Sequence, residues 1–155
     1  MELRRAKLGD VEVMMSLINK YAEQGSMLPR SRSMLYENIR EFLVVVENNQ
    51  IVAVGSLHII WEDLAEIRAL AVTSEFMGKG LGKKLVESLI NEALDLGCYR
   101  VFALTYQTEF FENCGFNVID KEEMPQKVWK ECINCIKFPN CDEVAVMYIS
   151  DNYKL

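Results

Sequence analysis

The sequence lacks long apolar runs, and no stretch approaches the roughly 18 residues of a membrane-spanning helix. Its first ten residues, MELRRAKLGD, are charged from the second position, which excludes a typical secretory signal. Basic residues are in the minority, with 17 Lys and Arg against 23 Asp and Glu and a formal net charge of −6. This balance argues against general binding to nucleic acid or to membrane surfaces. We therefore expect a cytoplasmic protein whose partners are small molecules.

Internal repeats, low-complexity segments and long linkers are also absent from the 155 residues. Half of the residues are hydrophobic, which is enough to supply a core. We therefore expect one domain that covers residues 1–155. The five cysteines are an odd number, and without a secretory signal we expect them to be reduced.

Periodic apolar residues predict a mixture of strands and helices along the chain. Strands are expected at residues 1–7, 42–47, 50–61, 64–72, 100–104, 116–119 and 143–149. Helices are expected from an N-cap at Asp10 to Gly25, and at residues 33–40, 80–96 and 108–114. A strand meander followed by a strand–loop–helix–strand crossover predicts an α/β (α+β) fold with a single sheet.

Three glycines alternate with other residues where a strand gives way to a helix, in the stretch EFMGKGLGKKL (75–85). Glycine lets a ligand approach backbone amides closely, and the first N–H groups of a helix have no partner within the helix. The pattern indicates an anion site, with a nucleotide phosphate as its natural ligand. The spacing fits neither a Walker A loop nor a dinucleotide fingerprint. An accidental glycine turn is the alternative.

The segment IRALAVTSEFMGKGLGKKLVESLI (67–90) and the later FFENCGF (110–116) resemble the GNAT N-acetyltransferases. This resemblance implies a mixed, mostly antiparallel sheet flanked by helices, and acetyl-CoA as cosubstrate. It also implies that the pyrophosphate lies on the loop amides and that the pantetheine arm pairs with the preceding strand. The implied cofactor-binding residues are Leu70, Ala71, Val72, Met77, Gly78, Lys79, Gly80, Leu81, Gly82 and Lys83. Met77 departs from the family pattern, which has Arg or Gln there.

A narrower resemblance, to the branch of this family that forms N-acetylglutamate, covers residues 22–39, 65–72, 104–116 and 127–146. It implies that Arg30 binds a substrate carboxylate, which suits the bidentate geometry of a guanidinium. Arg32 is a second candidate, and Ser31 is expected to donate a hydrogen bond. Surface charges that open a helix are the alternative. An edge strand in this fold often pairs into dimers, so a homodimer is possible.

Glu66 and Arg68 place two opposite charges in a strand that is otherwise apolar. In a regular strand both residues share a face with Leu70 and Val72. Such charges are costly unless they face a cleft or each other, so a structural ion pair is one reading. In the functional reading Glu66 is the general base, and Arg68 binds a carboxylate or orients Glu66.

Under this reading the deprotonated amine attacks the thioester, and a backbone N–H near Val72 stabilises the oxyanion. The family often places a proton-donating tyrosine where this chain has Phe111, so Tyr106 is the nearest candidate for the acid. A covalent route through Cys114 is disfavoured because ENCGF gives the thiol no neighbouring base. The single histidine, His58, fits a hydrogen-bonded position in the sheet better than a catalytic one.

Cys132, Cys135 and Cys141 have the spacing C-x2-C-x5-C, and the first pair matches a metal knuckle. Zinc usually takes four ligands, so the set is one short. Reduced cysteines that pack a loop are therefore favoured over a structural metal.

Three functions remain open at this point, besides a metal-responsive binding module that only the cysteine spacing supports. The first is an acetyltransferase for the α-amine of L-glutamate, in arginine biosynthesis, and the second acts on another small amine. The third is an acyl-CoA-binding sensor without catalysis, which the departures at Met77 and Phe111 would fit.

Overall fold

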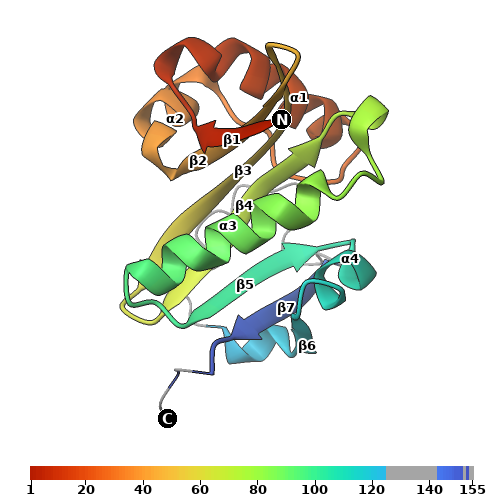
Figure 1. Cartoon of the computed structure of the whole chain (residues 1–155). Coiled ribbons are helices and arrows are strands. Elements are labelled where there is room, and N and C mark those ends of the chain that lie inside the picture. The colour runs from red at the N-terminus through yellow and green to blue at the C-terminus, as the bar shows by residue number, and fades with distance from the viewer. Residues whose placement is uncertain (125–142, 152, 154–155) are drawn as a thin grey trace. The chain divides into compact units, whose positions relative to one another are not determined.

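The structure is a computed structural model of the chain, and it describes residues 1–124, 143–151 and 153 (Figure 1). The chain divides into two compact units, residues 1–58 with 67–92 and residues 59–66 with 93–155. The single domain expected from the sequence stays a prediction. The cysteines at 132, 135 and 141 lie outside the described residues.

Seven strands form one sheet in the order β1-β2-β3-β4-β5-β7-β6. The β1–β2, β2–β3, β5–β7 and β6–β7 pairs are antiparallel, whereas β4 and β5 are parallel. The strands are β1 (Glu2–Arg5), β2 (Phe42–Glu47), β3 (Gln50–Trp61), β4 (Leu64–Val72), β5 (Arg100–Thr105), β6 (Asn117–Ile119) and β7 (Val144–Ile149). The predicted mixed, mostly antiparallel sheet flanked by helices is therefore confirmed.

Four α-helices accompany this sheet in the described part of the chain. They are α1 (Val11–Glu23), α2 (Arg32–Glu37), α3 (Leu81–Asp95) and α4 (Thr108–Glu112). Short 3₁₀ turns occur at Leu8–Asp10, Ile39–Glu41, Ser74–Phe76 and Lys121–Glu123. None of the described helices is long and apolar enough to cross a membrane.

The helix ends agree with the sequence at Gly25 and Gly97 but differ at Asp10. Both glycines have a positive φ, of 75° and 86°, which is the conformation that ends a helix at a glycine. Asp10 precedes α1 as predicted, but its side chain makes no capping hydrogen bond to the helix. The carboxylate instead accepts bonds from Arg4 at 2.7 and 3.1 Å and from the Lys7 N–H at 2.7 Å. Asp10 therefore joins the start of α1 to β1.

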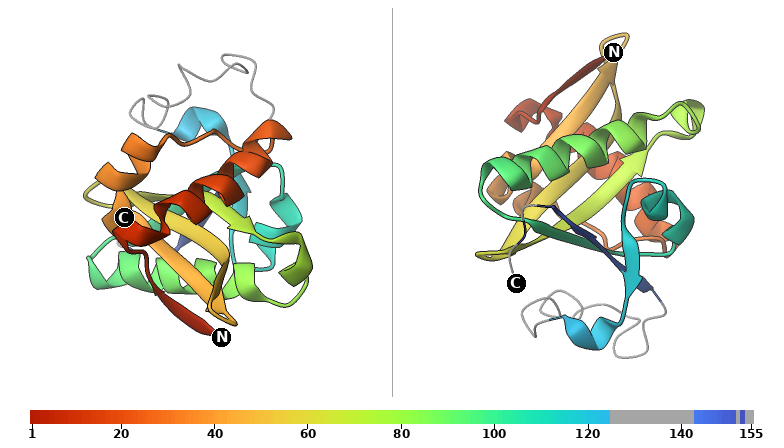
Figure 2. Two further views of the ribbon diagram at one scale, coloured as in Figure 1. Left: turned by 90° about the horizontal axis from the view of Figure 1, so that it is seen from above. Right: turned by 60° about the horizontal axis from the view of Figure 1, so that its bottom comes forward.

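In the first unit the strands lie between α1 on one side and α3 on the other (Figure 2). One cluster of buried residues joins α1 and α2 to the sheet: Val11, Met14, Leu17, Ile18, Leu35, Phe42, Val44, Val54, Ala69 and Ala71. On the α3 side a Cβ at Gly55 would lie 3.0 Å from Leu70 Cδ1 and 3.4 Å from Leu89 Cδ1. Glycine at position 55 therefore allows β3 and α3 to pack closely.

The second unit has its own apolar centre around β5, β6 and β7. Leu64, Phe102, Met124 and Met147 form a buried cluster. An aromatic group adjoins α4, in which Phe111 packs edge-on against Phe110 and Phe116, each with ring centroids 5.1 Å apart. Aromatic rings in this geometry contribute packing beyond their buried area.

Candidate active site

Strand β4 leads directly into the glycine loop and carries an unusual backbone conformation at Ala69. Its φ of 54° lies in the left-handed region, which is sparsely populated for residues other than glycine. The Arg68 carbonyl next to it accepts a hydrogen bond of 2.9 Å from Ser56 Oγ on β3. The regular alternation assumed from the sequence is therefore interrupted at Ala69. The common face predicted for Glu66, Arg68, Leu70 and Val72 does not follow from simple strand periodicity.

Glu66 is one of the few charged residues that the fold buries, with 6% of its surface exposed. It lies in β4 opposite Phe102 of β5 within the second unit, whereas Arg68 lies in the first unit and is half-buried. Both residues take part in hydrogen-bonding, ring or electrostatic interactions. A buried carboxylate in a central strand needs either such partners or a function to justify its desolvation.

The glycine loop has the geometry that an anion site requires. Gly78 and Gly80 have φ values of 77° and 80°, and a Cβ at either position would have nothing within 4 Å. The N–H of Lys84 makes the first helical bond, to the Gly80 carbonyl at 3.1 Å. The N–H groups at the preceding helix start lack partners within the helix. A phosphate could therefore approach this exposed backbone without meeting side chains.

Side chains around the loop supply positive charge. Lys79 is exposed, and its Nζ lies 4.8 Å from the centre of the Phe76 ring, in a cation–π contact. Lys83 is exposed on the first turn of α3, while Leu81 is buried and Gly82 is half-buried there. Met77 has 54% of its surface exposed, so it packs little against the rest of the protein. The loop thus offers amides and lysines, and Met77 supplies no polar group.

Tyr21, at the carboxyl end of α1, contacts the end of β4. Its hydroxyl donates a 2.5 Å hydrogen bond to the Val72 carbonyl, one residue before the loop begins. Burial raises the pKa of Tyr21, so the phenol stays protonated and remains a donor at neutral pH. The sequence pattern assigns no role to Tyr21. The residue type is the one available indication of a partly buried hydrogen bond, because tyrosine combines an apolar ring with a polar hydroxyl.

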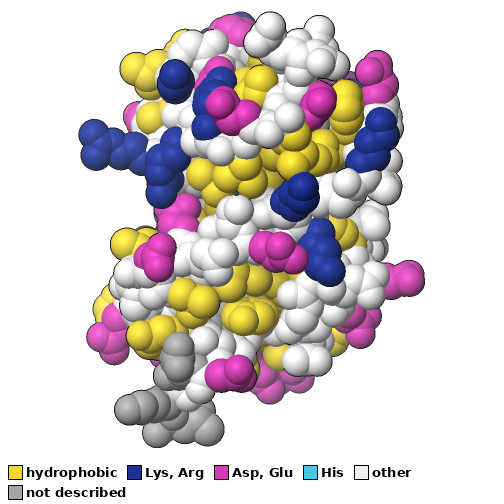
Figure 3. All heavy atoms as spheres, viewed as in Figure 1, with side chains coloured by type: hydrophobic (Ala, Val, Ile, Leu, Met, Phe, Trp, Pro, Cys, Tyr) yellow, Lys and Arg dark blue, Asp and Glu magenta, His cyan; other side chains and the backbone are white. Residues whose placement is uncertain are grey.

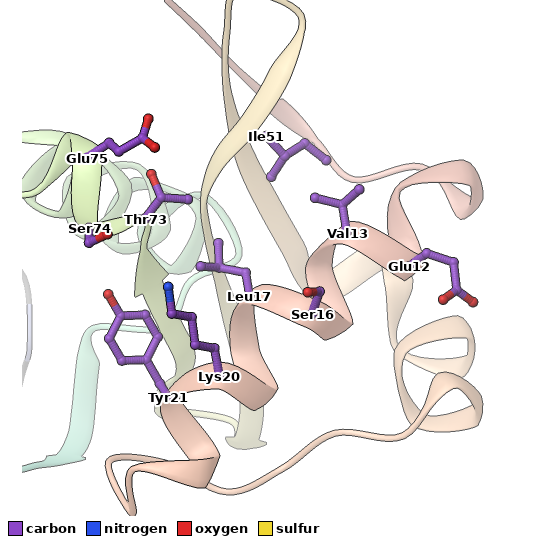
Figure 4. Close-up of a pocket in the computed structure, with 10 residues that line it drawn as sticks. All are labelled: Glu12, Val13, Ser16, Leu17, Lys20, Tyr21, Ile51, Thr73, Ser74 and Glu75. Carbon is purple, nitrogen blue, oxygen red and sulfur yellow. The ribbon is translucent and has the colours of Figure 1, made fainter.

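A pocket of about 460 Å³ lies between α1 and the first residues of the loop (Figure 4). It is lined by Glu12, Val13, Ser16, Leu17, Lys20, Tyr21, Ile51, Thr73, Ser74 and Glu75. Figure 4 shows Lys20 and Tyr21 pointing toward Thr73 and Ser74, with Glu12 at the far end. The Thr73 hydroxyl is buried and has no hydrogen-bond partner among the described residues. No sequence pattern predicts this pocket, because its walls come from three separate segments.

The two arginines considered for substrate binding have different surroundings. Arg32 pairs with Glu12 on the surface, and both side chains are about 60% exposed (61% and 59%). Arg30 is half-buried, and its backbone is bound by the side chain of Asn19. Ser31, between them, caps α2 by accepting a 3.2 Å bond from the Met34 N–H. Arg32 is therefore engaged in an exposed ion pair, and Arg30 is the better candidate for the substrate.

Tyr106 and Phe111 occupy different environments in the second unit. Tyr106 follows β5 and is 37% exposed, so part of this residue is open to solvent or a ligand. Phe111 is 4% exposed and belongs to the aromatic group of α4. A core residue without a polar group cannot donate a proton, as the sequence predicted for this position.

Among the described residues, His58 and the two cysteines Cys98 and Cys114 have surroundings that differ from those of a catalytic nucleophile with a neighbouring base. His58 Nδ1 lies 2.9 Å from a carboxylate oxygen of Glu41, which confirms a hydrogen-bonded position in the sheet. Cys98 is buried, and its burial raises the pKa of the thiol and makes it less reactive. Cys114 is partly exposed and reduced. Within residues 1–124 and 143–151, no group of His, Cys, Asp or Glu could hold a metal ion.

Charged side chains of both signs are interspersed on the face shown in Figure 3. This distribution agrees with the acidic net charge and gives no extended basic surface on that face. The positive groups of interest are therefore the local ones at the loop.

The comparison with known sequences identifies the family. The profile of the acetyltransferase (GNAT) family matches residues 12–116. An uncharacterized N-acetyltransferase of Chlorobaculum tepidum is 39% identical over 145 residues, which is 94% of each chain. The amino-acid acetyltransferase of Mycobacterium tuberculosis is 33% identical over 153 residues, or 97% of this chain and 87% of that protein.

A solved structure supports the same assignment. N-acetylglutamate synthase from Neisseria gonorrhoeae, complexed with coenzyme A and N-acetyl-glutamate, matches with a TM-score of 0.86 and 28% identity. The match covers 96% of this chain and 34% of the gonococcal one, so this chain spans about a third of that enzyme. The open amide cradle at Gly78 and Gly80 fits the phosphates of coenzyme A. The chain therefore belongs to the GNAT family of acetyltransferases and is an acyltransferase that uses acetyl-CoA as its cosubstrate.

Proposed function

We propose that the chain transfers the acetyl group of acetyl-CoA to the α-amine of L-glutamate by direct attack in a ternary complex. The observation that carries this proposal is the order of residues along β4. This strand bears the buried Glu66 carboxylate, then Arg68, and it ends at the glycine loop. The 33% identical relative is an amino-acid acetyltransferase, and the similar gonococcal structure holds N-acetyl-glutamate. The product, N-acetylglutamate, would commit glutamate to arginine biosynthesis.

Acetyl-CoA binds at the end of β4 and on the glycine loop. The pantetheine arm pairs with the backbone of Leu70–Val72, and the pyrophosphate accepts hydrogen bonds from the amides of residues 78–83. The open space around Gly78 and Gly80 and the cation of Lys79 support this assignment. Since amides supply most of the contacts, the missing Arg or Gln at Met77 weakens binding without abolishing it.

Glutamate brings two carboxylates and one ammonium group. Arg30 and Arg68 bind the carboxylates, and the Ser31 hydroxyl adds a hydrogen bond. The half-burial of both arginines supports this role, because partial desolvation strengthens an ion pair relative to one at the surface.

The reaction begins when Glu66, directly or through water, removes a proton from the substrate ammonium. The nitrogen lone pair then attacks the thioester carbonyl carbon, and a backbone N–H near Val72 stabilises the oxyanion. The attacking nitrogen gives up its second proton to water, the tetrahedral intermediate collapses, the C–S bond breaks, and the electron pair leaves with the coenzyme A thiolate. Tyr106 donates a proton to that sulfur, a role that the partial exposure of this tyrosine supports.

The test is coenzyme A release from acetyl-CoA, measured across single amino acids and polyamines for the wild type and Glu66→Gln. Glutamate-dependent turnover that falls about 100-fold or more in the variant is the expected result, since general-base catalysis typically contributes that much. Turnover on glutamine or a polyamine instead of glutamate would overturn the proposed substrate and leave the acetyltransferase assignment in place. Acetyl-CoA binding without turnover on any amine would favour an acyl-CoA sensor.

A further inference from the structure

Asn19 on α1 binds both backbone groups of Arg30. Its Nδ2 donates to the Arg30 carbonyl at 3.1 Å, and its Oδ1 accepts from the Arg30 N–H at 2.9 Å. One carboxamide thereby satisfies the donor and the acceptor of a single residue, as a neighbouring strand does in a sheet. Both bonds are partly buried, so solvent competes with them less than it would at the surface.

These two bonds lie in the middle of the segment between α1 and α2, which other contacts hold at its two ends. At the start of that segment the Ser26 N–H donates to the Tyr21 carbonyl at 3.0 Å, and Met27 packs against the core. At its end Ser31 caps α2. Arg30 lies between these anchors, and the Asn19 carboxamide fixes its backbone against α1. The Nε of Arg30 is shielded from solvent, so the base of the guanidinium is also enclosed.

We propose that Asn19 is a positioning residue that sets where the Arg30 guanidinium meets the substrate carboxylate. This inference rests on the proposed function, in which Arg30 binds that carboxylate. A bidentate pair between arginine and a carboxylate requires both N–H groups to align, and a small displacement of the backbone is transmitted to the fork. Asn19 therefore acts on the amino-acid substrate through Arg30, without touching either substrate.

The chain offers a matched control on the same unit. Asn38 also donates from its Nδ2 to a backbone carbonyl, that of Met34, at 2.9 Å. This bond is exposed and closes the end of α2, away from the backbone of Arg30. Asn38→Ala thus removes the same chemical group and a similar bond without affecting the position of Arg30.

The experiment measures kcat and KM for glutamate and for acetyl-CoA in the wild type, Asn19→Ala, Arg30→Ala, the double variant and Asn38→Ala. In Asn19→Ala the KM for glutamate should rise about tenfold, as expected for the loss of two net hydrogen bonds, while the KM for acetyl-CoA stays unchanged. Because Asn19 acts through Arg30, the double variant should match Arg30→Ala. Asn38→Ala should match the wild type in both KM values.

Two results would overturn the inference. The first is a KM for glutamate in the double variant that is raised by the full product of the factors measured in Asn19→Ala and Arg30→Ala. The second is a change in Asn19→Ala that is equal for the KM of glutamate and the KM of acetyl-CoA. If Arg30→Ala itself leaves the KM for glutamate unchanged, the carboxylate role in the proposed function fails, and the inference fails with it. Asn19→Asp keeps the size and the acceptor but loses the donor to the Arg30 carbonyl, so it serves if Asn19→Ala does not fold. An unchanged KM for glutamate in that variant would then count against the inference.

Discussion

The two ends of α1 are bound to the rest of the first unit by different chemistry. At the amino end, the contacts are mainly between charged side chains, as Asp10 makes with Arg4 and Glu12 with Arg32, and Asp10 also accepts one backbone bond from the adjacent Lys7 N–H. At the carboxyl end, the neutral side chains of Asn19 and Tyr21 bind the backbone of Arg30 and Val72.

The two ends of α1 therefore have different roles, because one attaches the helix and the other positions neighbouring segments. An ion pair between side chains tolerates several geometries, because both partners have flexible stems. A bond to a backbone group fixes the chain itself. The carboxyl end of α1 therefore determines the path of two segments that we propose to meet the two substrates, and the amino end holds the helix in place.

The largest expected effect is at the amino end, in Asp10→Ala. The change removes a two-fold hydrogen-bonded pair with Arg4 and the acceptor for the Lys7 N–H. We expect the free energy of unfolding to fall by about 2 kcal/mol, as for hydrogen bonds to a charged group, with both KM values unchanged. Urea denaturation and steady-state kinetics measure the two quantities. A raised KM for either substrate would break the distinction between the two ends of α1.

The same group makes part of the stability depend on pH. The hydrogen bonds from Arg4, more than the opposing effect of burial, hold the pKa of Asp10 below its ordinary value. A lowered pKa in the folded state stabilises the protein above the ordinary carboxyl pKa of about 4, and this contribution is lost as the pH falls through the lowered value. Urea denaturation at pH 7 and at about pH 3 should show the stability difference between wild type and Asp10→Asn shrinking in acid. A difference that grows in acid would contradict the pairing.

At the carboxyl end, Tyr21→Phe should have a moderate effect, and unlike Asp10→Ala it should change a KM value as well as stability. The change leaves the Val72 carbonyl without its donor, which should cost about 1 kcal/mol of stability. Since the end of β4 is where we propose that acetyl-CoA binds, its KM should rise about fivefold, with the KM for glutamate unchanged. Tyr36→Phe is the control, because Tyr36 is an exposed tyrosine on α2. Equal effects of the two variants would remove Tyr21 from the comparison.

The sequence predicted the parts of this fold that depend on local pattern. Apolar, β-branched runs predict β2, β3 and β4, because these strands are buried over much of their length, and Asn48-Asn49 between the first two is a pair typical of a tight turn. Both asparagines have a positive φ, of 50° and 62°, as a tight hairpin turn requires. The glycine loop was recognisable for the same reason, since only glycine adopts such conformations readily.

Other parts of the candidate site have no local signature. The left-handed φ at Ala69 is imposed by its surroundings, because alanine itself does not favour it. Asn19 and Tyr21 read as ordinary helix residues, and their partners lie 11 and 51 positions away in sequence. Which groups they bind depends on the path of the segment before Arg30 and on the position of β4. Neither is encoded in the spacing of residues along α1.

The smallest expected effect is that of Arg32→Ala, which distinguishes Arg32 from Arg30. The sequence alone left both arginines as candidates for the substrate carboxylate. Arg32 and Glu12 are both exposed, and an ion pair of this kind contributes little to stability because water and salt screen it. Arg32→Ala should therefore leave the unfolding transition and both KM values at the wild-type level, whereas Arg30→Ala raises the KM for glutamate. Parallel kinetics of the two variants at low and high salt make the distinction. If Arg32→Ala raised the KM for glutamate as much as Arg30→Ala, the surface pair would be part of the substrate site, and the amino end of α1 would position substrate as well.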